Sequence, residues 1–140
     1  MPNLVDAANT LVTVLQRGLV VSGNPTINVK LVIGSGDLMM SIKASGLREQ
    51  IFVYPTRTET DPKIGGVYNA ITDYVRAEIL VLTSGTSQTR LRTRVDDFKI
   101  TIASGTFTQP PRPYMTSENW PTPHTGVARA VLEYRFRHLE

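Results

Sequence analysis

The fold is decided by the stretch GVARAVLEYRFRH, residues 126–138, in which apolar and charged side chains alternate. A period of two places successive side chains on opposite faces of an extended chain. One face carries the apolar set Ala128, Ala130, Leu132, Tyr134 and Phe136, and the other carries the charged set Arg129, Glu133, Arg135 and Arg137. The stretch therefore predicts a half-buried strand whose apolar row packs against helices and whose charged row looks outward.

Length and composition indicate one globular domain spanning residues 1–140. Hydrophobic residues make up 41% of the 140 residues and charged residues 19%, and cysteine is absent, which excludes disulfides and thiolate chemistry. Every apolar run is far shorter than the roughly 20 residues that cross a bilayer, so no membrane contact is expected. The N-terminal residues lack the basic leader of an export signal, so we expect the protein to be made and kept in a cytoplasm.

The N-terminal half predicts a helix followed by strands. Residues 4–17 place leucine, valine and alanine at helical spacing, and Gly18 stands where such a helix would end. Residues 26–33 alternate as a strand does, and a glycine-rich turn at 34–37 favours a return strand at 38–44.

The middle of the chain predicts two strands separated by a loop. Residues 50–54 form a compact apolar run, which Pro55 is expected to end. The polar stretch 56–68 has no helical period and is predicted to be an interaction loop. Residues 72–83 carry apolar groups on both faces of an extended chain, which predicts a central strand.

Residues 88–103 allow two interpretations. Leu91, Val95, Phe98 and Ile102 recur at i, i+4, i+7 and i+11, which favours an amphipathic helix. The alternative is a β-hairpin, because apolar residues also alternate near the end of this segment and threonine and valine favour strands. The helix is the preferred prediction.

The segment 105–125 is rich in proline and is predicted to be a stiff, extended arm outside the sheet. The order of elements is then helix, strand pair, strand, loop, strand, helix, arm and strand. Two helices can cover one face of a mainly antiparallel sheet, so the predicted class is α+β.

No catalytic or cofactor signature is found. His124 and His138 lack partners at metal-ligand spacing, and the adjacent carboxylates Asp96 and Asp97 point about 100° apart on a helix. We therefore expect no enzyme activity, cofactor or metal; a small hydrolase with an unrecognised site is the least favoured alternative.

Arginine dominates the positive charge and suggests contacts between subunits. Eleven of the fifteen cations are arginine, whose guanidinium group pairs with carboxylate or phosphate in bidentate fashion, and the net charge is only +3. Candidate interface residues are Arg57, Glu59, Arg90, Arg94, Arg112, Tyr114, Trp120, Arg129, Glu133, Arg135 and Arg137. A nucleic-acid-binding module using Arg90, Arg92 and Arg94 is the alternative, although only Arg90 and Arg94 share a helical face.

The layout resembles the tail terminator proteins of tailed bacteriophages. These small α+β domains have an N-terminal helix, a central sheet, a second helix, an irregular segment and an alternating C-terminal strand. The matching segments here are 4–17, 50–54, 74–83, 91–103 and 128–137. The likeness is one of element order, with a strong early β segment at 26–44 that the family pattern does not require.

The resemblance implies a homo-oligomeric ring, usually a hexamer, that catalyses no reaction. Such a ring would cap the tail tube, bind the head connector or head-completion protein, and let DNA pass without specific binding. It would belong to the virion neck after assembly in the host cytoplasm, with an arginine-bearing sheet edge and the segments 56–66 and 109–124 as contact regions. A head-completion, tube or baseplate protein is the neighbouring alternative.

Overall fold

A computed structural model describes residues 4–20, 27–32, 49–64, 68–82, 87–107, 112–121 and 127–139. Its elements are α1 (Leu4–Leu15), the π-helical turn η1 (Gln16–Val20), β1 (Ile27–Leu31), β2 (Glu49–Ile64), β3 (Tyr68–Leu82), α3 (Ser87–Ser104), β4 (Tyr114–Asn119) and β5 (Val127–Leu139).

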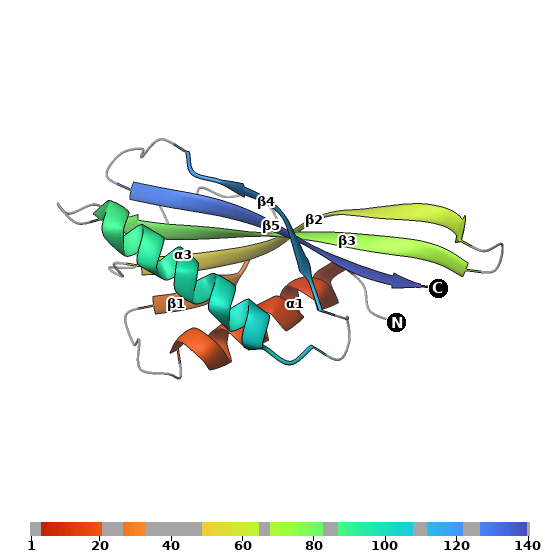
Figure 1. The fold of residues 1–140 in the computed structure, drawn as a ribbon, viewed down its shortest axis with the longest axis horizontal. Helices are drawn as coiled ribbons and strands as arrows, with labels where there is room; N and C mark the ends of the chain where they lie inside the picture. Colours follow the sequence, from red (N-terminus) through yellow and green to blue (C-terminus); the bar gives the residue numbers. More distant parts are fainter. Residues whose placement is uncertain are drawn as a thin grey trace.

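The strands form one sheet in the order β1-β2-β3-β5-β4. The β1–β2 pair is parallel and the other three pairs are antiparallel. Both long helices lie on the same side of this sheet (Figure 1), where their apolar side chains join those of the strands in one core. The predicted α+β class, with two helices on one face of a mainly antiparallel sheet, is confirmed.

The alternating stretch forms β5, and its apolar row is buried as predicted. Ala128, Ala130, Leu132 and Phe136 are fully buried, and Tyr134 is nearly so. The strand does not lie at a sheet edge, however, because it pairs with β3 on one side and β4 on the other. The expected arginine-bearing edge is thus an arginine-bearing face, and the edge belongs to β4.

The helix prediction for residues 88–103 is confirmed by α3, so the hairpin alternative is wrong. Leu91, Val95, Phe98 and Ile102 are buried on one side of α3. A helix places all four side chains on the face that packs on the sheet, and this burial favours the helix over a hairpin. The first predicted helix is also confirmed, since α1 continues into η1.

Gly18 and Gly105 allow the N-terminal helical segment (α1 and η1) and α3 to approach each other closely. A Cβ atom on Gly18 would collide with the side chain of Thr101 in α3. A Cβ atom on Gly105, just after α3, would collide with Val14 in α1. Gly18 therefore lies inside a helical turn for reasons of packing, rather than ending a helix as the sequence suggested.

The interaction loop predicted at 56–68 is wrong, because β2 runs on to Ile64 and β3 begins at Tyr68. Pro55 does not end β2: β1 stops opposite Val53, and the strand passes the proline with a register shift before Arg57. The stretch is polar because residues 57–60 of β2, which pair with β3 on one side, are exposed to solvent.

The arm predicted outside the sheet at 105–125 is also wrong in part, because β4 lies within it and pairs with β5. Pro113 and Pro121 flank the strand rather than interrupt it, so the residues between them keep their backbone donors. The predicted strands at 26–33 and 72–83 are confirmed by β1 and by the central β3. The predicted turn at 34–37 and return strand at 38–44 lie outside the described residues.

Candidate interaction surface

The face of the sheet opposite the helices, here called the outer face, carries a row of alternating arginine and tyrosine. Arg57 of β2 pairs with Tyr74 of β3, which pairs with Arg135 of β5, which pairs with Tyr114 of β4. Directly paired residues of antiparallel strands project from the same face. The row therefore crosses four strands at one level of the sheet.

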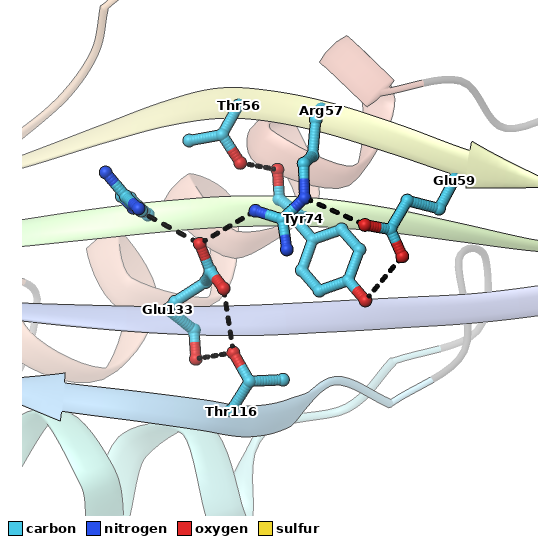
Figure 2. Close-up of polar contacts among 7 residues, drawn as sticks. Thr56, Arg57, Glu59, Tyr74, Thr116 and Glu133 are labelled. Atoms are coloured by element: carbon cyan, nitrogen blue, oxygen red, sulfur yellow. Dashed lines mark hydrogen bonds and ion pairs between the residues drawn. The ribbon is translucent and has the colours of Figure 1, made fainter.

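Glu133 anchors the middle of this surface (Figure 2). Its Oε2 atom accepts hydrogen bonds from Arg57 Nη1 at 3.4 Å and Arg76 Nε at 3.2 Å. Thr116 Oγ1 lies 3.1 Å from Glu133 Oε1 and 3.2 Å from its backbone oxygen. The side chain of Glu133 is only 9% exposed. One carboxylate thus ties β5 to β2, β3 and β4.

This arrangement corrects the expectation that Glu133 looks outward to a partner. Its side chain projects from the outer face as predicted, but the guanidinium groups of Arg57 and Arg76 cover it. Burying a carboxylate costs free energy unless charged groups contact it, and Glu133 contacts two guanidinium groups. Glu133 consequently holds two half-exposed guanidinium groups in fixed positions.

Arg57 makes a second set of contacts along the ribbon. Its Nε donates to Glu59 Oε1 at 3.1 Å, and its guanidinium carbon lies 3.8 Å from the centre of the Tyr74 ring. Tyr74 donates its hydroxyl proton to Glu59 Oε2 at 3.1 Å, as Figure 2 shows. The hydrogen bonds from Arg57 and Tyr74 lower the pKa of Glu59, and the bond to Glu59 raises the pKa of Arg57. These exposed contacts orient side chains more than they stabilise the fold.

Two predicted interface arginines keep their charge available. Arg135 and Arg137 are exposed, and neither has an ion-pair partner within the described ranges. Arg129 is half-buried on the same strand, and its Nε has no hydrogen-bond partner in the structure.

A second surface lies along β4, the sheet edge. All six of its residues are exposed, and two are large and apolar: Tyr114 is 63% exposed and Met115 is 45% exposed. Trp120, the next residue after β4, adds a third exposed apolar side chain. A groove of about 400 Å³ separates this strand from α3 and includes Met115 and Arg112 in its lining. Backbone groups and apolar side chains are therefore accessible together at this edge.

Polar contacts hold this edge firmly on the domain. Lys99 of α3 forms an ion pair with Glu118 of β4, and Trp120 Nε1 donates to Glu118 Oε2 at 2.9 Å. The contacts of Lys99 and Trp120 lower the pKa of Glu118. These contacts hold β4 in a fixed position relative to α3.

Arg112, another predicted interface residue, acts within the subunit. Its guanidinium group donates to the carbonyl oxygens of Ile102 at 3.3 Å, Ala103 at 2.6 Å and Gly105 at 2.9 Å. These carbonyls end α3 and lack partners within the helix. Arg112 therefore caps the C-terminus of α3.

The arginines of α3 do not form one surface. Arg94 donates to Glu49 Oε2 at 2.8 Å and to Asp97 Oδ2 at 3.0 Å, and its side chain is 13% exposed. Arg90 and Arg92 are exposed. Arg94 therefore fixes α3 to the start of β2, which leaves two of the three arginines that the nucleic-acid interpretation requires.

Sequence reasoning missed Arg76, Tyr74, Thr116 and Met115. Alternation in residues 72–83 already placed Tyr74 and Arg76 on one face, which could have identified them. Thr116 and Met115 gave no such signal, because their proline-flanked segment was interpreted as lying outside the sheet.

Compared with known proteins, the chain matches neither a family model nor a curated protein sequence. In the described part of the chain, no helix has both the length and the apolar character needed to span a bilayer. Within the same ranges, no three histidine, aspartate or glutamate side chains gather into a potential metal site.

Proposed function

We propose that this chain is a structural subunit that assembles with copies of itself into a ring of the tail-terminator type and catalyses no reaction. The observation that carries the proposal is the open edge at β4, where Tyr114, Met115 and Trp120 are exposed beside unpaired backbone. Soluble proteins usually protect such edges with charges, bulges or covering segments. β4 has a register shift between Met115 and Ser117, yet the large apolar side chains along it stay exposed, which suits this edge to being covered by another protein.

The composition of the outer face supports the same function. Arginine and tyrosine are enriched at protein interfaces, and Arg57, Tyr74, Arg135 and Tyr114 line up across the sheet. Glu133 and Glu59 fix the guanidinium group of Arg57 before any partner arrives, which reduces the entropy lost on binding. The free charges of Arg135 and Arg137 are then available to carboxylates of a neighbouring chain.

The phage assignment rests on element order. The α+β architecture, with a helix before the sheet and a second helix before the last two strands, is compatible with the tail-terminator resemblance. In this proposal the ring, a hexamer, sits in the virion neck, binds the tail tube protein on one side and the head connector or head-completion protein on the other.

Assembly and tail length test this proposal. Native mass spectrometry of the purified chain should give a closed oligomer, and electron microscopy should show a ring. Deleting the gene from its phage should yield tail tubes of uncontrolled length that fail to join heads. A chain that stays monomeric at high concentration, or a deletion phage with normal tails, would refute the proposal.

One observation favours a second candidate function, the binding of single-stranded nucleic acid. The outer face brings tyrosine rings beside arginines, a combination that stacks bases and neutralises phosphate. Against it, Arg57 already covers the Tyr74 ring, and Glu133 already pairs with Arg57 and Arg76. Fluorescence anisotropy with labelled oligothymidylate decides between the two, because this mode requires affinity that falls steeply with salt.

A further inference from the structure

The sheet has an open edge on each of its two opposite sides, along β4 and along the part of β2 that extends beyond β1. β1 pairs with β2 only as far as Val53, so later β2 residues have no described neighbour on that side. Residues 57–60 of β2 are exposed, and the ribbon of β2 and β3 extends beyond the two helices (Figure 1). From Tyr54 to Arg57 the sheet is four strands wide, in the order β2-β3-β5-β4. Beyond Arg57 it narrows to β2, β3 and β5, because β4 begins at Tyr114, opposite Arg135.

The third edge, β1, differs because a side chain of another element forms a hydrogen bond with its backbone. The side-chain amide of Gln16, in η1, donates to the carbonyl oxygen of Val29 at 3.2 Å, and Val29 is buried. The chain thus uses a side chain from another element to satisfy part of this edge. No comparable contact protects the outer side of β4 or residues 57–60 within the described ranges, which marks those two edges as available.

The two open edges can pair with each other between copies. All neighbours among these four strands are antiparallel, so β2 and β4 run in opposite directions. A second copy in the same orientation, placed with its β2 beside β4, would therefore continue the antiparallel order. β4 has six residues, and the open stretch of β2 at 55–60 has the same length, which is about 20 Å of strand.

Charge and apolar area agree with this pairing. Residues 55–60 of β2 contain one positive and one negative side chain, Arg57 and Glu59, which form an ion pair with each other. The single charged residue of β4, Glu118, is already paired with Lys99, so it adds no repulsion. An incoming strand would also cover Tyr114, which is 63% exposed.

We propose that β4 accepts residues 55–60 of β2 from a neighbouring copy as an added antiparallel strand, which joins the two sheets. This inference rests on the proposed self-assembly and names its contact. Because the two surfaces differ, each copy can donate one and accept one, and such head-to-tail contacts make a ring when the rotation closes. The bound stretch contributes backbone hydrogen bonds, as in other cases of strand addition.

Cysteine cross-linking tests the contact cleanly, because the natural chain contains no cysteine. Glu59→Cys and Ser117→Cys change exposed residues of the β2 edge and of β4 that project from the same outer face. Each variant is purified, mixed with the other under assembling conditions and treated with a short bismaleimide. Mass spectrometry identifies the linked peptides. Thr93→Cys, on the exposed side of α3, is the matched control.

We expect the mixture to lose most of its monomer and gain a product of twice the mass linked between residues 59 and 117. Each single variant, and either one mixed with Thr93→Cys, should stay at background. A variant carrying both changes should form a ladder that ends at the ring. The pair Thr60→Cys and Met115→Cys, which project from the other face of the same contact, repeats the test if either first variant loses its circular dichroism spectrum.

Three results would overturn the inference, and they are distinguishable. Cross-linking of Ser117→Cys with itself would indicate a two-fold contact between β4 strands. An intact ring in native mass spectrometry without any 59–117 link would place the contact elsewhere and leave the proposed function standing. A chain that is monomeric under all conditions would remove both the contact and the proposed function.

Discussion

The two faces of the sheet differ in the character and the exposure of their side chains. The helix-covered face is mainly apolar, and its apolar side chains from β2, β3 and β5 are buried with those of α1 and α3. Glu49 and Asp73 are buried acidic residues on that face. The outer face carries the Arg57–Tyr74–Arg135–Tyr114 row and its carboxylates, most of them exposed. The difference indicates that the inner face determines stability, whereas the outer face and its β4 edge are available for assembly. Substitutions can separate the two roles.

The largest effect is expected on the inner face. Phe98→Ala removes a fully buried ring that packs on Tyr134, with ring centres 5.8 Å apart. The free energy of unfolding should fall by about 3–5 kcal/mol, measured by urea unfolding followed by circular dichroism. Ile100→Ala on the same helix is the control: this side chain is 65% exposed, so the loss should stay near 0.5 kcal/mol. Equal losses would contradict the assignment of α3 faces.

An intermediate effect is expected where the outer face contains a buried group. Glu133→Gln keeps the shape of the side chain but removes the charge that holds Arg57 and Arg76. The free energy of unfolding should therefore fall by about 1–3 kcal/mol. Glu59→Gln is the matched change at an exposed carboxylate and should have a clearly smaller effect in the same urea titration. A neutral Glu133→Gln variant would show that the network contributes nothing to stability.

Charge reversal on the outer face should affect assembly alone. Combining Arg135→Glu with Arg137→Glu should leave the unfolding curve unchanged, because both side chains are exposed and unpaired within the described ranges, but should impair oligomer formation. Native mass spectrometry measures the loss. Arg90→Glu combined with Arg92→Glu makes the same change in charge on α3 and should leave assembly intact. Normal assembly of the folded β5 variant would count against a role for these arginines.

The smallest effect is expected at acidic pH around β4. Contacts with Lys99 and Trp120 lower the pKa of Glu118 below 4.5, so their stabilisation is present above that pH and is lost as the pH falls through the lowered value. Trp120, the single tryptophan, should report the change by fluorescence. Glu118→Gln should abolish this acidic transition. Its persistence in that variant would assign the transition to another group.

The sequence was most informative where one periodicity dominated. Alternation identified β5 and its buried row, and helical spacing identified α1 and α3, because burial on one face imposes those periods. It failed for residues 57–64, since both strands of a solvated ribbon can be polar and still satisfy each other's backbone. It failed for β4 because Pro113 and Pro121 obscured the proline-free strand between them.

The candidate surface was predicted in part. Alternation placed Arg135 and Arg137 on the correct face, because only local geometry was needed. The roles of Arg94 and Arg112 could not be predicted, because their partners Glu49 and Ile102 are brought near by tertiary folding alone. The contacts of Glu133 come from residues of three other strands, β2, β3 and β4, and the pattern of one strand does not reveal them.

The position of β5 also bears on how fast the chain folds. A strand formed by residues 127–139 lies between β3 and β4, so β3 cannot acquire its second neighbour until a distant segment arrives. Contacts of such long sequence separation slow the search for the native state. During that delay the unpaired side of β3 and its apolar row are accessible to other chains. Expression at low temperature and low concentration should therefore favour soluble product over aggregation.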